Sequence, residues 1–393
     1  MKAGWQIKTL GEVLQRTETV NPLQSPETEF DYIDVSSVSN QTFQIEETQR
    51  LTGKNAPSRA RRLVKSDDVL FATVRPTLRR IALVPNELDH QVCSTGYFVL
   101  RPKLGLDHRF VFYFLFSEDF MGQMEKLQKG ASYPAVTDGE VRAQTIPIPP
   151  LPEQHRIVGI LDEAFDSIAT AKANAEKNLK NARALFDSHL EAVFSQRGEG
   201  WEEKKVSEIA KHSLGKMLDK AKNKGEAQPY LRNLNVRWFE FDLSDVLEMR
   251  FLPDEAAKYT AVRGDVLICE GGYPGRAAIW DADEPIYFQK ALHRVRFHAP
   301  EYNKWFVYYL YSQDKSGELR GHFTGTGIQH FTGEALGRMQ LPVPPISETH
   351  RFISKIEELA AETQRLEVLY RRKLTALEEL KKALLHQAFA GEL

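Results

Sequence analysis

The sequence predicts an α+β protein in which two similar domains are each followed by a long helix. Three observations support this fold class. A proline-rich motif occurs twice, as IPIPPLPEQHRIVGIL at residues 146–161 and as LPVPPISETHRFISKI at residues 341–356. Shorter patterns recur at nearly the same offset upstream of the motif. Apolar residues follow each motif at steps of three and four, the spacing of a helix that packs on another helix.

The repeat extends through most of the chain. Near the N-terminus, the Trp5 pattern W-x-x-K-x-L-x-E-V returns at Trp201 as W-x-x-K-x-V-x-E-I, and Asp68-Val69-Leu70-Phe71 returns as Asp265-Val266-Leu267-Ile268. Within the motif, residues return 195 positions later: Pro147, Pro149, Pro150, Glu153, His155 and Arg156 correspond to Pro342, Pro344, Pro345, Glu348, His350 and Arg351. We therefore interpret the chain as two copies of one unit.

The first part of each copy mixes strand and helix patterns. Short apolar runs rich in β-branched and aromatic residues predict strands at Asp68–Val74, Tyr97–Leu100, Val266–Cys269 and Arg294–Phe297. Helical spacing predicts helices at Arg109–Ser117 and Lys304–Ser312. Glycines and prolines separate these runs, as in GGYPG at residues 271–275. This mixture favours a compact α+β domain in each copy.

The second part of each copy predicts a long helix. We call the row of apolar or small residues that would face a partner helix a seam. A shift by 195 positions carries the seam of the first helix onto a second seam from Phe352 to Ala388. Lys381 is the one charged residue in this second seam, and we expect its neighbour Leu380 to take its place. The first seam has alanine where the second has bulky residues, so the two helices should pair with each other. The first seam consists of Ile157, Leu161, Ala164, Ile168, Ala171, Ala175, Leu179, Ala182, Phe186, Leu190 and Val193.

The proline motif marks the passage from globular domain to helix. Proline has no amide hydrogen and disfavours a helical conformation in the residue before it, so the motif should hold the chain extended. Pro152 suits the first turn of a helix, and Ser347 suits an N-cap. Glu153 and Glu348 then lie where the helix dipole favours negative charge. We interpret the motif as a structural joint.

Composition excludes several classes of protein. The chain is 42% hydrophobic and 27% charged, with a net charge of −2, as in ordinary soluble proteins. It has no signal-peptide pattern and no apolar run of the roughly 20 residues that a membrane span requires. Two cysteines, Cys93 and Cys269, cannot build a disulfide scaffold or a cysteine-rich zinc site. We expect a cytoplasmic protein without a membrane association.

Positive charge is concentrated in two stretches despite the neutral average. Residues 50–80 carry nine basic and two acidic side chains, and residues 204–224 carry seven lysines beside Glu208 and Asp219. Such stretches can neutralise phosphates in a nucleic acid. A solvated surface with scattered lysines is the alternative interpretation.

The order of these parts resembles the specificity (S) subunit of Type I restriction–modification systems. The resemblance covers the whole chain, and it is carried most specifically by Pro147-Ile148-Pro149-Pro150-Leu151-Pro152-Glu153-Gln154. The QAFAGEL sequence at residues 387–393 also looks like the usual ending of that family. The second motif departs from the pattern at Ile346-Ser347-Glu348-Thr349, where the match is weaker.

The resemblance implies a function and a set of partners. Each globular part would be a target-recognition domain that reads one half of a split, asymmetric site in double-stranded DNA. The helices would form an antiparallel coiled coil with pseudo-two-fold symmetry that spaces the domains and docks two methyltransferase subunits. Endonuclease–translocase subunits would complete the restriction complex. The chain itself would be a non-catalytic specificity subunit that needs no cofactor.

On this interpretation the chain divides into four parts. Target-recognition domains occupy residues 1–150 and 198–345, and spacer helices occupy residues 151–197 and 346–393. The seam from Ile157 to Val193 would be about 55 Å long at about 1.5 Å per residue. Domains held that far apart would contact half-sites separated by about one to two turns of DNA, at about 34–36 Å per turn.

No motif for catalysis is found. The Pro-Pro pairs lack the preceding Asn or Asp and the following aromatic residue that amino-methyltransferases of DNA use to hold a flipped base. Gly325-Thr326-Gly327 lacks the third glycine of a dinucleotide-binding loop. Pro253-Asp254 and the Glu379-x-Lys381 pair lie too far apart in the chain to suggest a nuclease site. We therefore predict no catalytic residue and no metal ligand.

The candidate DNA-binding residues lie in paired loops, because base edges and phosphates are contacted mainly by basic, amide and hydroxyl side chains. One pair is the stretch 75–80 and the stretch 272–276, and the other is 130–137 and 325–332. The two loops of the second pair have different residues at their centres although the sequence around them is repeated, as we expect of loops that read different half-sites. An ordinary surface role is the alternative for any single residue. The candidates are Arg75, Thr77, Arg79, Arg80, Ser132, Tyr133, Thr137, Lys216, Lys220, Tyr273, Arg276, Thr326, Gln329 and His330.

Two further functions stay open at this level. A coiled-coil scaffold that joins two protein-interaction modules would show no salt-sensitive affinity for DNA. A self-sufficient modifying enzyme would transfer a methyl group to DNA without a partner, but the missing motifs argue against it.

Overall fold

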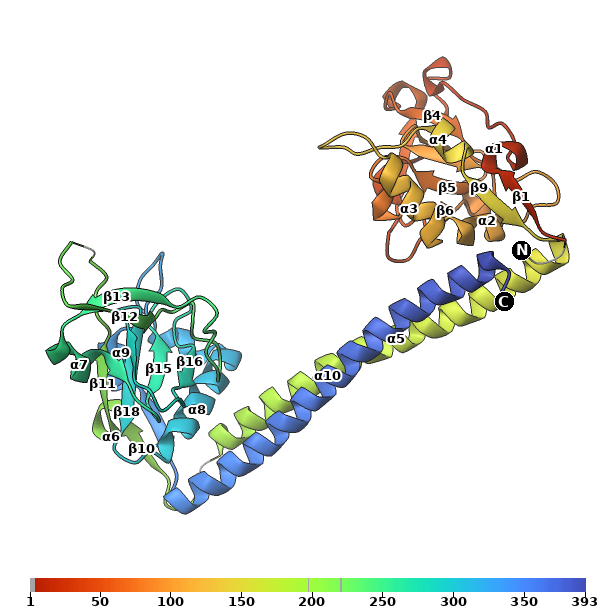
Figure 1. The fold of residues 1–393 in the computed structure, drawn as a ribbon. Coiled ribbons are helices and arrows are strands. Elements are labelled where there is room, and N and C mark those ends of the chain that lie inside the picture. The colour runs from red at the N-terminus through yellow and green to blue at the C-terminus, as the bar shows by residue number, and fades with distance from the viewer. Residues whose placement is uncertain (1–3, 197, 220) are drawn as a thin grey trace. The chain divides into compact units, whose positions relative to one another are not determined.

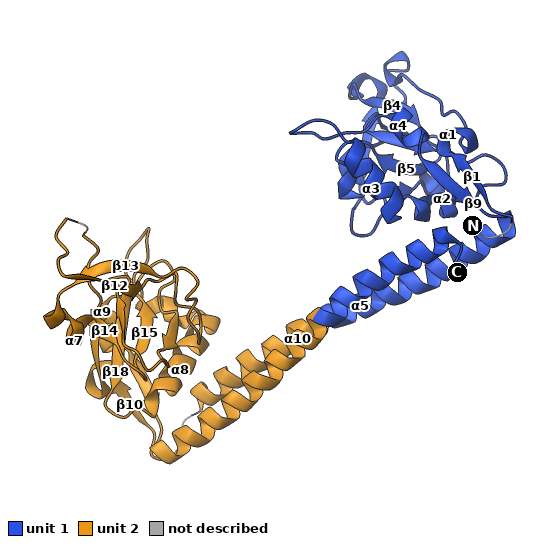
Figure 2. Ribbon diagram, viewed as in Figure 1, with its two compact units in different colours: residues 1–176, 372–393 blue, residues 177–371 orange. Residues whose placement is uncertain are grey.

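The computed structural model describes residues 4–196, 198–219 and 221–393, which form two compact units. Unit 1 comprises residues 1–176 and 372–393, and unit 2 comprises residues 177–371 (Figure 2). Each unit contains one α+β domain together with one segment of each of the two long helices, α5 (Leu151–Ser195) and α10 (Ile346–Ala390) (Figure 1). The predicted α+β class with long helices after each domain is confirmed.

The domain of unit 1 is built on two sheets and a strand pair. One sheet has the order β3-β2-β7-β4, and the other has the order β6-β5-β8. Strands β1 and β9 pair antiparallel, so the first strand of the domain lies beside the last. The strands are β1 (Gln6–Thr9), β2 (Glu29–Ile33), β3 (Gln49–Thr52), β4 (Ala60–Leu63), β5 (Val69–Ala72), β6 (Ile81–Leu83), β7 (Val92–Ser94), β8 (Tyr97–Leu100) and β9 (Thr145–Ile148). The helices are α1 (Leu10–Val13), α2 (His108–Phe114), α3 (Glu118–Leu127) and α4 (Asp138–Arg142).

The domain of unit 2 repeats this plan. Its sheets have the orders β11-β18-β15-β16 and β13-β12-β17-β14, and strands β10 and β19 form the pair. The strands are β10 (Glu202–Lys205), β11 (Ala210–Leu214), β12 (Glu226–Leu231), β13 (Leu247–Phe251), β14 (Thr260–Ala261), β15 (Val266–Cys269), β16 (Ala277–Ile279), β17 (Ile286–Phe288), β18 (Leu292–Phe297) and β19 (Gln340–Val343). The helices are α6 (Val206–Ile209), α7 (Ala256–Tyr259), α8 (Tyr302–Ser316) and α9 (Gly333–Arg338).

The strands and helices predicted from the apolar runs are confirmed at β5, β8, β15, β18, α2 and α8. An ion pair between an arginine and a buried aspartate recurs in the two domains and explains why aspartate precedes each of the strands β5 and β15. Arg101 contacts Asp68 through two hydrogen bonds of 2.8 and 2.7 Å, and Arg296 contacts Asp265 through two of 2.7 and 2.6 Å. Both aspartates are almost fully buried, so each carboxylate depends on its arginine for compensation.

The joint between domain and helix depends on a buried polar side chain after the prolines. In unit 1, the Gln154 side chain donates to the carbonyl oxygens of Pro149 and Gly105 and accepts from the amide of Asp107. In unit 2, the hydroxyl of the equivalent Thr349 donates to the carbonyl of Pro345. Pro152 lies in the first turn of α5, as expected. The N-cap predicted at Ser347 is wrong, because α10 already begins at Ile346.

The two long helices run antiparallel within each unit. In unit 1, the Nζ of Lys172 lies 2.7 Å from Glu378 while Arg156 donates to the backbone oxygen of Leu393, so residue numbers rise on α5 as they fall on α10. In unit 2, Arg183 contacts Glu367 at 2.6 Å. A shift of 195 converts one ion pair into the other with the charges exchanged, which indicates the same helix register in both units.

One expectation about the seam is wrong. We expected Leu380 to replace Lys381 in the seam, but the side chain of Leu380 is 46% exposed. The Nζ of Lys381 instead lies 4.9 Å from the ring centroid of Phe43 and 4.8 Å from that of Phe165, with Phe116 at 6.0 Å. The aliphatic stem packs inward while the ammonium faces aromatic rings, which a seam of apolar residues alone does not predict.

Candidate nucleic-acid interface

A hairpin projects from the domain of unit 1 and carries two of the predicted residues, Ser132 and Tyr133. Lys129 and Ala135 exchange two backbone hydrogen bonds of 2.9 Å, and Gly130 makes the turn possible with a φ of +106°. Between them, Ser132 is exposed and Tyr133 is 71% exposed. In Figure 1 this hairpin is the yellow loop that extends away from the sheets. We call residues 129–135 hairpin 1.

The basic loop after β5 packs directly against hairpin 1. Val74 and Ala135 form a β-bridge, the amide of Arg75 donates to the carbonyl of Pro134 at 2.6 Å, and the amide of Val136 donates to Thr73. The guanidinium of Arg75 donates to the carbonyl of Ser132 and lies 4.9 Å from the ring centroid of Tyr133. The structure therefore brings the two predicted loops of this domain together on one exposed surface.

The remaining candidates of unit 1 differ in their freedom to contact DNA. Thr77 is exposed and Arg79 is half-buried, and both line a cavity of about 360 Å³ that also includes Glu118 and Glu125. Arg80 donates to the carbonyl oxygens of Ser36 and Val38, so its guanidinium holds a neighbouring loop.

Thr137 has a structural task. Its hydroxyl accepts a hydrogen bond from the amide of Glu140 at 3.2 Å and caps helix α4, and the backbone and hydroxyl of Thr137 lower the pKa of Glu140 to about 2. Thr332 caps α9 in the same way in unit 2. Because the cap fixes the segment that follows hairpin 1, we regard Thr137 as a residue that positions the surface.

Unit 2 contains the equivalent hairpin at residues 324–330, which we call hairpin 2. Thr324 and His330 exchange backbone hydrogen bonds of 2.8 and 2.9 Å, and Gly325 has a φ of +102°. Gly271 forms a β-bridge with His330, just as Val74 does with Ala135. Thr326, Ile328, Gln329 and His330 are all exposed. Ile328, which corresponds to Tyr133, is 76% exposed.

The glycine-rich loop of unit 2 adds an aromatic and a basic side chain beside hairpin 2. Tyr273 is 55% exposed, and the guanidinium of Arg276 lies 4.0 Å from its ring centroid. Arg276 also donates to the carbonyl of Asn233 at 2.9 Å, and the Asn233 amide donates to the carbonyl of Gly271 at 3.0 Å. Asn233 was missed in the sequence because no motif marks it, although it holds the loop against its neighbour.

His293 supports hairpin 2 from the interior. Its side chain is 1% exposed, and its Nε2 lies 3.0 Å from the carbonyl oxygen of Phe331, directly after the hairpin. Burial lowers the pKa of His293 to about 4, so the ring is neutral at neutral pH and Nε2 can donate to that carbonyl. Nothing in the sequence around His293 distinguishes it from an ordinary core residue.

Lys216, which the sequence offers as a phosphate contact in the lysine-rich stretch of unit 2, is already engaged within its own domain. The Lys216 side chain is buried, pairs with Glu255, donates to the carbonyl of Arg250 and lies 4.9 Å from the ring centroid of Phe251. A phosphate would have to displace Glu255, so we leave Lys216 out of the surface. Lys220, the other candidate, lies outside the described residues.

The positive charge of residues 50–80 is also partly neutralised within the domain. Arg50 contacts Asp31 and Glu29, Arg62 contacts Asp138, and Lys65 contacts Glu18. The count of basic residues therefore overstates the charge that this stretch can offer to phosphates. Arg75 remains exposed at the base of hairpin 1, and its guanidinium donates to the carbonyl of Ser132 rather than to a carboxylate of the described residues.

Two further properties of the described residues concern metal ions and membranes. Over residues 4–196, 198–219 and 221–393, no group of three or more His, Cys, Asp or Glu side chains is arranged to hold a metal ion. None of the helices described in this structure is both long and apolar enough to cross a membrane.

Comparison with known proteins gives consistent results. Relatives include the type I restriction enzyme EcoKI specificity subunit of Escherichia coli K12, 24% identical over 324 residues that cover 77% of this chain and 69% of that protein. The MjaVIII specificity subunit of Methanocaldococcus jannaschii is 23% identical over 310 residues, covering 73% of this chain and 71% of that protein.

Solved structures agree over the full length. The HsdS subunit from Thermoanaerobacter tengcongensis matches with a TM-score of 0.74 and 29% identity, covering 100% of this chain and 98% of that one. A chain from a structure concerned with assembly and conformational transition of the type I R-M system matches with a TM-score of 0.87 and 28% identity, covering 100% and 99%. Residues 2–181 and 198–371 match the family model of the type I restriction modification DNA specificity domain. These two stretches make up most of the chain, which therefore belongs to the family of type I restriction-modification specificity subunits.

Proposed function

We propose that the chain selects the DNA sequence on which a type I restriction–modification complex acts. Each domain reads one half of a bipartite, asymmetric site in double-stranded DNA with its hairpin and the adjoining loop. Two methyltransferase subunits assemble with the chain and supply the chemistry, endonuclease–translocase subunits join them, and the complex works in the cytoplasm. In this proposal the chain is not itself catalytic.

One observation supports this function above the others. The same two loops meet in each domain, through the bridge of Val74 with Ala135 and the bridge of Gly271 with His330. The frame is alike, but the exposed side chains on it differ, with Tyr133 in one hairpin and Ile328 at the equivalent position of the other. A constant frame that presents different side chains is what two readers of unlike half-sites require.

The surface has the chemistry that base reading needs. Arg75 and Arg276 each place a guanidinium beside an exposed tyrosine, so a cation and an aromatic face are offered together in both domains. Gln329 adds an exposed amide that can both donate and accept, as contact with adenine requires.

The test is the genome-wide methylation pattern of a host that expresses the chain with its methyltransferase partner. The same host with the partner alone is the control. We expect a split, asymmetric motif that is present only when the chain is present. A stable complex that adds no methylated motif would contradict the proposal and favour the scaffold function.

A further inference from the structure

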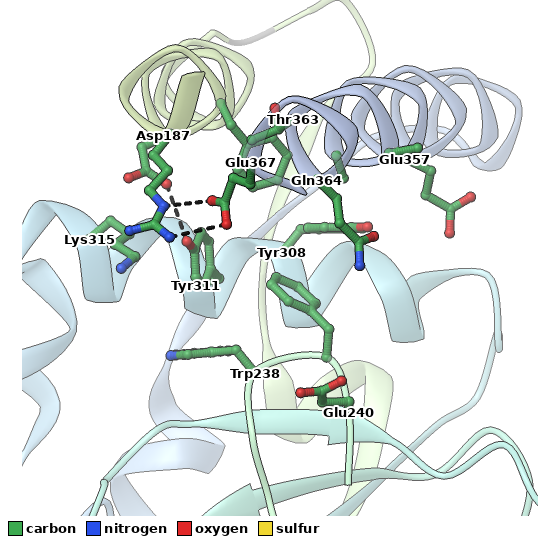
Figure 3. Close-up of a pocket in the computed structure, with 15 residues that line it drawn as sticks. Asp187, Trp238, Glu240, Tyr308, Tyr311, Lys315, Glu357, Thr363, Gln364 and Glu367 are labelled. Carbon is green, nitrogen blue, oxygen red and sulfur yellow. Dashed lines mark hydrogen bonds and ion pairs between the residues drawn. The ribbon is translucent and has the colours of Figure 1, made fainter. Parts of the chain in front are cut away.

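A pocket of about 730 Å³ lies in unit 2 between the helices α5, α8 and α10 and the turn at residues 238–240. Figure 3 shows Tyr308 and Tyr311 in its middle, with α10 above them and the turn that carries Trp238 and Glu240 below. It takes no part in the reading surface, which is formed by hairpin 2 and the loop at 272–276.

The equivalent place in unit 1 is occupied by a lysine of the chain itself. There Phe43 and Phe116 pack edge to face at 4.6 Å, and the ammonium of Lys381 faces these rings and Phe165. Burial lowers the pKa of Lys381, which is consistent with an ammonium enclosed by rings rather than by water. We call these three rings and the lysine the filled cage.

The wall of the cage recurs in unit 2. Phe239 corresponds to Phe43 at a shift of 196, and both have the rare positive φ, 69° and 57°. Tyr311 corresponds to Phe116 at a shift of 195, and its ring packs on Phe239 at 5.1 Å.

The filling of the cage does not recur. A shift of 195 relates Lys381 to Phe186 and Phe165 to Ala360, so unit 2 has a phenyl ring where unit 1 has the ammonium and a methyl group where unit 1 has a ring. Phe186 and Ala360 both line the pocket. The aromatic wall is therefore kept while the cation that fills it in unit 1 is absent, and the pocket stays open.

The charges around the pocket favour a cation. Its lining includes the carboxylates of Asp187, Glu240, Glu357 and Glu367 and two basic side chains, Arg183 and Lys315. Arg183 is already paired with Glu367. Glu357 is paired with Lys304, and Arg371 also contacts Glu367, so the negative charge of the pocket comes from Asp187 and Glu240. Lys315 is exposed and lies 5.1 Å from the centroid of one ring, that of Tyr311. Lys315 therefore covers one ring, whereas Lys381 faces three.

The tyrosines of the pocket stay neutral and keep their rings available. Burial raises the pKa of Tyr308 to about 12, and burial together with Asp187 raises the pKa of Tyr311. Neutral rings beside carboxylates attract an ammonium or guanidinium and repel a phosphate, which excludes the DNA backbone as occupant.

We propose that this pocket receives a lysine or arginine side chain of a protein subunit that assembles with the chain. The inference rests on the proposed function for the identity of that subunit, the methyltransferase. The incoming side chain takes the place that Lys381 takes in the filled cage, with its charge over the rings and near Glu240.

The pocket chemistry can be tested without any partner. The full chain is labelled with 5-fluorotryptophan, and the fluorine resonance of Trp238 is assigned by its loss in Trp238→Phe. We expect Nα-acetyl-lysine methylamide to shift this resonance saturably and the uncharged Nα-acetyl-norleucine methylamide to leave it in place. Phe186→Lys, which supplies an ammonium in cis, should abolish the response. Equal shifts from both probes, or an unchanged response in Phe186→Lys, would overturn the proposal.

The partner is tested by assembly with the methyltransferase subunit. Glu240→Gln removes one exposed carboxylate of the pocket, and Glu248→Gln on strand β13, also exposed, is the matched control. Glu240→Gln should weaken assembly by about five- to tenfold, the size of one cation contact with a ring or carboxylate, while the control should not change it. Equal affinities for the two variants overturn the partner assignment. If the wild-type chain fails to assemble at all while the lysine probe still binds, the proposed partner is wrong and the pocket chemistry stands.

Discussion

Replacement of Lys381 by alanine measures how much the filled cage contributes to unit 1. The variant loses the methylenes Cγ, Cδ and Cε, which are half-buried in the structure. At about 0.8 kcal/mol for each fully buried methylene, and about half of that here, the loss is about 1 kcal/mol. The ammonium lies within 5 Å of the ring centroids of Phe43 and Phe165, which is worth about 1–2 kcal/mol, but the burial that lowers its pKa offsets most of this gain. We therefore expect the free energy of unfolding to fall by about 1–2 kcal/mol, most of it from the buried methylenes.

The comparison with Leu380 makes this prediction decisive. Leu380→Ala removes a neighbouring side chain that is 46% exposed, so its cost should stay within about 0.5 kcal/mol. Lys381→Met keeps most of the stem and removes the charge, and should cost less than about 1 kcal/mol, because the lost ring contacts are offset by the relief of burying a charge. The assay is urea unfolding of the three variants and the wild type at pH 7.5. If Leu380→Ala destabilises the protein more than Lys381→Ala, the seam expected from the sequence is right and the cage is wrong.

Three further predictions concern the reading surface. Arg75→Ala should weaken binding of the assembled complex to its methylated motif by about tenfold, while Arg50→Ala should not, because Arg50 is already paired with Asp31 and Glu29. Fluorescence anisotropy on a DNA duplex measures both affinities, and equal effects of the two variants would contradict the prediction. Gly325→Ala should lower DNA affinity by about tenfold, because φ is +102° and the added Cβ would lie 2.4 Å from the carbonyl oxygen of Ile328, whereas Gly327→Ala meets nothing within 4 Å and should bind normally. Because of His293, the free energy of unfolding should fall as the pH falls from about 6.5 to about 4, since in this range the unfolded chain binds a proton that the native ring does not. The effect is up to about 3 kcal/mol. Urea unfolding measures it, and His293→Gln should lack it.

The fold followed from patterns that are local in sequence. The apolar runs at β5, β8, β15 and β18 were sufficient to predict strands, since every second or every residue in them is buried. The proline motif predicted where the helices begin, except that Ser347 lies inside α10. Local signals predict local structure well because neighbouring residues determine it.

The site residues were harder to predict because their partners are remote. Arg75 and hairpin 1 could be named from composition, but their bridge joins Val74 to Ala135, which lie 61 positions apart. Lysine is a residue type that often contacts phosphates, but Lys216 is paired with Glu255, which comes from another segment and could not be predicted as its partner. Lys381 was misjudged for the same reason, since Phe43 and Phe116 come from the domain and not from the helix.

An exchange of the hairpin tips tests most directly whether each domain reads its own half-site. Ile328 and Gln329 are replaced by the Tyr and Pro that occupy the equivalent positions of hairpin 1, and the methylation motif is determined in a host with the methyltransferase partner. The account predicts that one half of the bipartite motif changes or is lost while the other half and the spacing stay as in the wild type. A motif that keeps both halves, or that changes in both, would contradict it.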